Sequence, residues 1–87
     1  MAVWATVVAL AQLGRRQPAV VVDLQPDAGP PGNLTERLRE LGFLDGEEVQ
    51  VLAAGAAGGP LAVRVGESTF ALRIAEAERV RVRCRPR

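Results

Sequence analysis

Residues 38–46 read Leu-Arg-Glu-Leu-Gly-Phe-Leu-Asp-Gly, and this stretch decides the fold. Gly42 stands where a left-handed glycine typically ends a helix, because it has no Cβ to clash in that conformation. The Asp-Gly pair at residues 45 and 46 is typical of a tight turn. The stretch therefore predicts the end of a helix, a glycine stop and a turn into a strand that begins near residue 47.

The helix that ends at this glycine is predicted over residues 34–41. Asn33 and Glu36 match a capping box, in which each side chain bonds a backbone N–H group at the start of the helix. Leucines recur at i, i+4 and i+7 from Leu34, which places them on one helical face. We expect that face to pack against the core.

Most of the remaining chain alternates apolar and polar residues, which is the pattern of β-strands. We predict five short strands, over residues 19–24, 47–52, 61–66, 69–74 and 79–85. The third and fourth should form a hairpin, and residues 75–77 should form a single helical turn. Val20, Val22 and Leu24 should share one face of the first strand.

Composition and strand number together indicate the fold class. A chain of 87 residues has room for one domain with one modest core, so residues 1–87 are predicted as a single domain. Five strands with a valine-rich inner face close most easily as a small barrel. The predicted fold is therefore mainly β, an SH3-like barrel of about five strands with one short helix.

The first residues and the loop before the helix are less decisive. Residues 3–10 have helical spacing but many β-branched side chains, so they fit a short helix or an extended lead-in. This apolar segment is free to cover the barrel or to pair with a second copy, which leaves the oligomeric state open. Residues 25–33 are rich in proline and glycine and should form a surface connection.

The bulk properties exclude several classes of function and compartment. A net charge of +1 gives no general attraction to nucleic acid. The apolar start of the chain has no basic residues before it, unlike a signal peptide, and is too short to span a bilayer. A single cysteine excludes an internal disulfide and fits a reducing compartment. We expect a soluble, cytoplasmic protein.

Catalytic and metal-binding chemistry lacks the residues it needs. The chain has no histidine and no tyrosine, and Cys84 falls on an apparent inner face without a partner base. Glu47 and Glu48 are adjacent and should point to opposite faces of a strand, so they do not converge on a metal ion. We predict no catalytic residue, no cofactor and no tight iron site.

Candidate binding residues fall into two groups. Phe43 should plug the end of the barrel, and Leu44 should lie outside beside Arg37 and Asp45 as a docking candidate. The other group is an arginine stripe on the outer face of the last strand, formed by Arg79, Arg81, Arg83 and Arg85. The stripe fits either a solvated edge strand, whose charges deter aggregation, or a contact with an acidic partner or the anionic inner leaflet.

At this point the sequence resembles the FeoA family, the small partner of the bacterial ferrous iron transporter FeoB, and the SH3-like module of iron-dependent repressors. The resemblance covers roughly residues 10–83 and rests on these residues: Leu13-Gly14, Val20, Leu38, Leu41-Gly42-Phe43, Gly46, Val49, Val51, Gly59-Pro60-Leu61, Val63, Leu72-Arg73, Glu76-Ala77, Val80 and Val82. The proline-rich loop and the apolar start with Trp4 depart from the family pattern.

The resemblance implies a non-enzymatic interaction module that supports ferrous iron uptake by docking on the cytosolic GTPase region of FeoB. It would be peripheral to the membrane through that partner, without nucleic acid or a small-molecule substrate. The alternative is a regulatory SH3-like module associated with an iron-dependent transcriptional repressor. From these expectations, the partner-binding candidates are Arg37, Leu44, Asp45, Arg79, Arg81 and Arg83.

Overall fold

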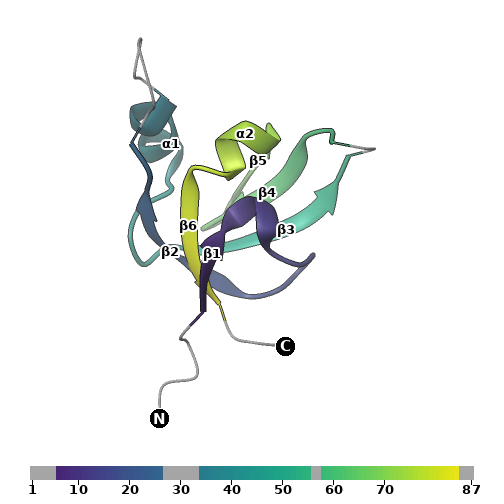
Figure 1. The fold of residues 1–87 in the computed structure, drawn as a ribbon, viewed down its shortest axis with the longest axis horizontal. Coiled ribbons are helices and arrows are strands. Elements are labelled where there is room, and N and C mark those ends of the chain that lie inside the picture. Colours follow the sequence, from purple (N-terminus) through teal and green to yellow (C-terminus); the bar gives the residue numbers. More distant parts are fainter. Residues whose placement is uncertain (1–5, 27–33, 56–57, 85–87) are drawn as a thin grey trace.

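The computed structural model describes residues 6–26, 34–55 and 58–84, which form one antiparallel sheet with short helices at its ends (Figure 1). In chain order the elements are β1 (Thr6–Ala9), the 3-10 helix η1 (Leu10–Gln12), β2 (Ala19–Leu24), α1 (Leu34–Leu41), β3 (Glu48–Ala54), β4 (Leu61–Val65), β5 (Ser68–Leu72), α2 (Ile74–Ala77) and β6 (Val80–Cys84). The mainly β, SH3-like fold is confirmed. The described residues contain six strands rather than five, because residues 6–9 are extended.

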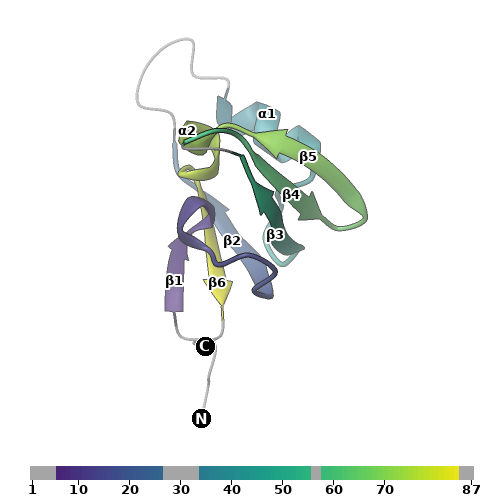
Figure 2. The same ribbon diagram turned by 90° about the vertical axis from the view of Figure 1, so that its right-hand side faces the viewer.

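The strand order is β1-β6-β2-β3-β4-β5, so the last strand of the chain lies between the first two. The sheet bends sharply where β2 meets β3, which pair only through Ala19 with Val49 and Val20 with Glu48 (Figure 2). Within the described residues β1 and β5 do not pair with each other, so the barrel stays open between them.

The predicted helix and hairpin are confirmed. α1 spans residues 34–41, as expected; Asn33, its predicted cap, lies outside the described residues, as does most of the loop over 25–33. β4 and β5 pair in register from Leu61 with Leu72 to Val65 with Ser68. The predicted helical turn at 75–77 is α2, which begins one residue earlier, at Ile74.

Two expectations about strands need correction. In β2 the buried residues are Ala19 and Val21, and the register against β6 shifts between Val21 and Asp23. This bulge breaks the alternation that placed Val20, Val22 and Leu24 on one face. In β6 the arginines do lie outward, but the strand is paired on both sides and is not an edge strand.

The core fills the concave side of the bent sheet. Its completely or almost completely buried members include Phe43, Leu10, Leu38, Leu72 and Val82. The inward residues of β3 to β6 alternate as predicted, so burial of branched aliphatic side chains stabilises the whole sheet. No helix among the described residues is long and apolar enough to cross a membrane.

Candidate functional site

The corner after α1 is shaped by its backbone. Gly42 has φ of +113°, and its N–H donates to the carbonyl of Arg39 over 3.1 Å. The N–H of Phe43 donates to the carbonyl of Leu38, also over 3.1 Å. These two bonds form a Schellman motif, which ends the helix after Leu41 and requires a residue that tolerates positive φ. The glycine stop predicted from the sequence is confirmed.

The turn into β3 is tied to β2. The N–H of Glu47 donates to the carbonyl of Leu44 over 2.9 Å, and Gly46 in this turn has φ of +89°. The N–H of Gly46 donates to the carbonyl of Val21 over 2.8 Å, and the N–H of Val21 donates to the carbonyl of Glu47 over 2.9 Å. The corner is therefore held on both sides, so the side chain at its tip has a defined direction.

That side chain is Leu44, which is 46% exposed, whereas its neighbour Phe43 is 1% exposed. Both predictions are confirmed: Phe43 lies in the core, and Leu44 lies outside. Leu44 borders a shallow hollow of about 230 Å³. The hollow is lined by Val22, Asp23, Leu24, Arg39, Phe43, Leu44 and Asp45.

Arg37 is not beside Leu44, where the sequence placed it. Its Nη1 donates to Oε2 of Glu76 over 2.8 Å, and the other carboxylate oxygen of Glu76 accepts the N–H of Arg73 over 2.9 Å. The ion pair joins α1 to α2, and Arg37 is not among the residues that line the hollow. Arg39, two residues further along the helix, takes the expected position beside Leu44.

The arginines of β6 differ in their partners. Arg81 donates from Nε to Oδ1 of Asp23 over 2.6 Å and from Nη2 to Oδ2 over 2.5 Å. Arg79 donates from Nη1 to the carbonyl of Pro26 over 3.0 Å. Arg83 has no side-chain hydrogen bond or ion pair to any described residue. Arg85, the fourth arginine of the predicted stripe, lies outside the described residues. The other three differ in their surroundings and do not form one continuous patch of free charge.

The paired carboxylate responds to its partner. The hydrogen bonds from Arg81 hold the pKa of Asp23 below its ordinary value of 3.8, outweighing the opposite effect of slight burial. Reciprocally, the hydrogen bond to Asp23 raises the pKa of Arg81. Both side chains are nearly half exposed, so water and salt screen much of this interaction.

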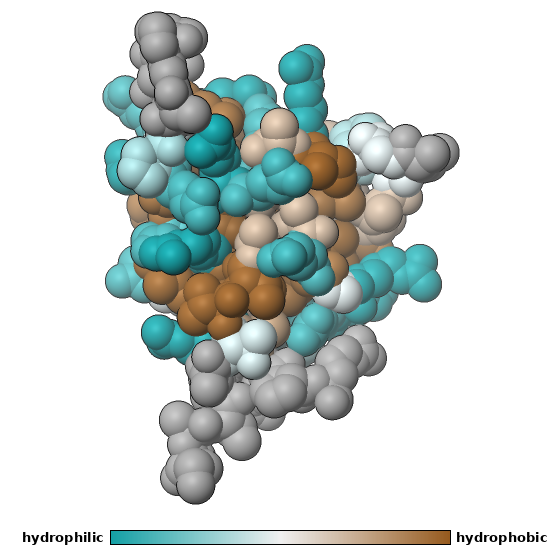
Figure 3. Space-filling model, in the orientation of Figure 1, coloured by the Kyte–Doolittle hydropathy of each residue, from teal (hydrophilic) through white to brown (hydrophobic). Residues whose placement is uncertain are grey.

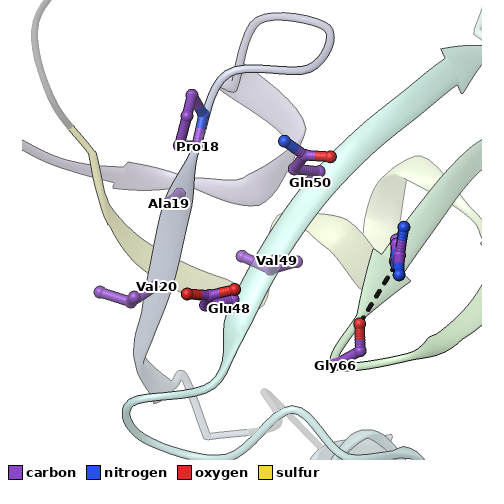
Figure 4. Close-up of a pocket in the computed structure, with 8 residues that line it drawn as sticks. Pro18, Ala19, Val20, Glu48, Val49, Gln50 and Gly66 are labelled. Atoms are coloured by element: carbon purple, nitrogen blue, oxygen red, sulfur yellow. Dashed lines mark hydrogen bonds between the residues drawn. The ribbon is translucent and has the colours of Figure 1, made fainter.

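A second hollow, of about 350 Å³, lies over the outer face of β3 between β2 and β4 (Figure 4). Glu48 lies against Val20 there, and Gln50 lies farther along β3. Arg64 also lines the hollow, where its Nε donates to the carbonyl of Gly66 over 3.3 Å. The side chains that line the hollow thus include one carboxylate, one guanidinium and one amide, but no hydroxyl, thiol or imidazole.

The described part of the chain has few side chains that could bind a metal ion or act as a nucleophile. Cys84 is a free thiol and is buried on the inner face of β6, as its alternation predicted. No three carboxylate, imidazole or thiol side chains of the described residues converge on a point that could hold a metal ion. What the arrangement offers chemically is a set of contact surfaces.

Sequence reasoning missed Asp23 and Arg39 as members of these surfaces. Asp23 meets Arg81 because the bulge in β2 turns its side chain to the outer face. A bulge of this kind leaves no mark in the alternation of apolar residues. Arg39 could have been placed from the helix, since it lies one turn before the predicted glycine stop.

The comparisons with known proteins agree with this geometry. The model of the FeoA domain matches residues 8–84. The FeoA of Stenotrophomonas maltophilia, solved with zinc, is 47% identical, with coverage of 86% of this chain and 88% of that one and a TM-score of 0.76. That protein is described as a prokaryotic SH3 domain protein and a candidate activating factor of bacterial ferrous iron transport.

A second FeoA structure, described as an iron uptake regulatory protein, is 31% identical, with coverage of 90% of this chain and 96% of that one and a TM-score of 0.74. A manganese-dependent transcriptional repressor is 19% identical, with coverage of 90% of this chain and 41% of that one and a TM-score of 0.76, which shows a shared fold alone. No functionally curated protein matches the chain. On the family match and the two FeoA structures, the chain belongs to the FeoA family.

Proposed function

We propose that this chain is a non-enzymatic interaction module that supports ferrous iron uptake by docking on the cytosolic GTPase region of a FeoB-like transporter. The observation that carries the proposal is the exposed Leu44, held by a rigid corner in a member of the FeoA family. The description of the Stenotrophomonas relative as a candidate transport activating factor supports it. The proposal places the chain in the cytoplasm, where the GTPase region lies.

The side chains that the sequence contains support a role in binding rather than in catalysis. The sequence contains no histidine or tyrosine, and its one thiol is buried. Iron would be the cargo of the transporter, and this chain would act by contact with its partner.

The Leu44 corner, defined as Leu44 with Arg39 and Asp45, has the form of a small docking site. Interfaces gain most of their binding energy from a few anchor residues, which a rim of surrounding contacts shields from water. Leu44 is the anchor, and Arg39 and Asp45 are the rim. Arg37 and Arg81 are already paired within the chain, so they are secondary candidates.

The alternative, a regulatory module acting beside an iron-dependent repressor, is supported only by the shared fold of the repressor structure. The Stenotrophomonas FeoA, which is 47% identical and is described as a candidate activating factor of ferrous iron transport, favours the transport role.

The proposal predicts that Leu44→Lys weakens binding to the cytosolic GTPase region of the cognate transporter about tenfold or more, since a charge replaces an apolar side chain that the complex would bury. Isothermal titration calorimetry with the nucleotide-loaded region measures the dissociation constant. Thermal unfolding should barely change, because substitutions at exposed positions shift stability by about 0.5 kcal/mol or less.

Ala54→Lys is the matched control, since Ala54 is exposed and ends β3 at the end of the strand opposite the corner. It adds the same charge to an exposed apolar position and should leave this affinity unchanged. Equal loss in both variants, or no binding by the unaltered chain, would refute docking through Leu44. A large drop in the stability of Leu44→Lys would show that Leu44 belongs to the core.

A further inference from the structure

The free edge of β1 is a second exposed surface, two strands away from β2, which lines the hollow beside Leu44. β1 pairs with β6 on one side and has no strand of the described residues on the other (Figure 2). Figure 3 shows a hydrophobic area on this side of the molecule with hydrophilic side chains beside it, and Val7 is one of the two large apolar residues exposed in the described chain.

The hydrogen bonds show which backbone groups face the free edge. The N–H of Ala9 donates to the side-chain oxygen of Gln12 over 3.0 Å, so it does not bond to β6. In an antiparallel pair, residues alternate between bonding to the partner strand and pointing away from it. The register Val7 with Arg83 and Ala9 with Arg81 contains no shift, so the N–H and C=O of Val7 point to the free edge.

This edge lacks the usual protection against strand addition. Edge strands are commonly blocked by a charge, a proline or a bulge. β1 reads Thr-Val-Val-Ala and has none of these, while Gln12 closes only the end at Ala9. The open part is therefore centred on Val7.

The neighbouring strand adds a charge with a defined position. Arg83 lies directly opposite Val7 on the outer face and is exposed. Arg81 is held by Asp23 and Arg79 by the carbonyl of Pro26, whereas Arg83 has no ion pair within the described residues. A free guanidinium thus lies on β6, about 10 Å from a strand added beyond β1. The long side chains of Arg83 and of a glutamate on the same face of the added strand can together span this distance.

The geometry points to β1 as a site for strand addition by an extended, acidic segment of a partner protein. The segment would bond the N–H and C=O of Val7 and extend a carboxylate over Val7 to Arg83. Its adjacent residues would be apolar and would cover the half-buried Val8 on the inner side. This site is separate from the Leu44 corner and does not depend on docking there.

Two other candidates for binding at the free edge of β1 fit it less well, namely a second copy of this chain and an anionic lipid surface. A second copy paired through β1, which reads Thr-Val-Val-Ala, would bring no acid to Arg83 and would leave its guanidinium unpaired. An anionic lipid surface could neutralise Arg83 but could not bond the paired donor and acceptor of Val7.

The test uses the full chain labelled with ¹⁵N and blocked synthetic peptides of sequence Thr-Val-Glu-Val-Thr, with Lys or Gln at the centre as matched controls. Chemical shifts at millimolar peptide should change along β1 and β6 with the Glu peptide. Arg83→Gln should weaken that binding about two- to fivefold, the range of an exposed ion pair, and should abolish the preference for Glu over Gln. The Lys peptide should bind more weakly than either.

Val7→Pro removes the outward N–H without breaking the bonds of β1 to β6, and it should abolish binding, while Val7→Thr should retain it. Circular dichroism checks that each variant remains folded. Equal binding of the Glu and Lys peptides, unaltered binding by Val7→Pro, or no shifts at all would overturn the proposal. So would Val7-dependent dimers in sedimentation without peptide binding, or Arg83-dependent binding to phosphatidylglycerol vesicles that Val7→Pro leaves intact.

Discussion

At the scale of single residues, Asp23 joins two surfaces that the sequence shows as separate. Its carboxylate lines the hollow beside Leu44 and also receives both hydrogen bonds from Arg81. By occupying Arg81, Asp23 leaves Arg83 as the arginine of β6 without a partner in the described chain. One carboxylate thereby determines where positive charge is available on the outer face.

Asp23→Asn should lower the free energy of unfolding near neutral pH, because it removes a carboxylate whose folded-state pKa is depressed. A depressed pKa contributes stability above the ordinary aspartate value of 3.8, and this contribution is lost as pH falls through the lower folded-state pKa. The difference between variant and unaltered chain should therefore be small at pH 7 and vanish at strongly acidic pH. Urea unfolding across pH measures it.

The same difference should shrink at high salt, since both side chains are nearly half exposed. Asp45→Asn is the control, because Asp45 lines the same hollow and makes no ion pair with a described residue. A difference for Asp23→Asn that persists unchanged in acid would contradict the role of the ion pair.

At the scale of elements, the two α-helices are joined by Glu76. This carboxylate is 11% exposed; one oxygen accepts the N–H of Arg73 at the start of α2, and the other accepts from Arg37 of α1. α1 is also held by its leucine face, of which Leu38 is buried, and by the Thr35 hydroxyl, which donates to the carbonyl of Gln25 over 3.0 Å. Glu76 adds a third anchor that helps to fix the orientation of the helix from which the Leu44 corner extends.

Glu76→Ala should destabilise the fold by about 2 kcal/mol, since it leaves a partly buried N–H without its charged acceptor. Arg37→Ala should cost less, because the Arg37 side chain is 61% exposed. Urea denaturation measures both, and hydrogen exchange of α1 amides should accelerate in each. An equal loss in the two variants would show that the capping bond to Arg73 contributes little.

At the scale of the whole molecule, the features set by neighbouring residues were predictable and those set by strand order were not. The helix over 34–41, its glycine stop and the β4–β5 hairpin each depend on local signals, and all three are confirmed. The insertion of β6 between β1 and β2 depends on contacts across nearly the whole chain. Alternation in β6 showed which face its arginines occupy but not that the strand is internal.

The features of the candidate site also fall into those that local sequence predicts and those that depend on tertiary packing. The exposure of Leu44 follows from its place after a helix stop, and it was predicted. The ion pair of Asp23 depends on a bulge in β2, and the pairing of Arg37 with Glu76 depends on how two helices meet. Both arise from tertiary packing, which periodicity does not encode.

The pairing of Thr6 with Cys84 has a mechanical consequence. Thr6 begins β1 and Cys84 ends β6, so the two residues lie at the same end of this strand pair. A force that pulls the two ends of the chain apart would therefore act first on this pair and then separate the strands one residue pair at a time. Unzipping of this kind breaks few hydrogen bonds at once, so we expect a low rupture force. Single-molecule stretching by the termini would measure it, and a high single peak would argue against this loading geometry.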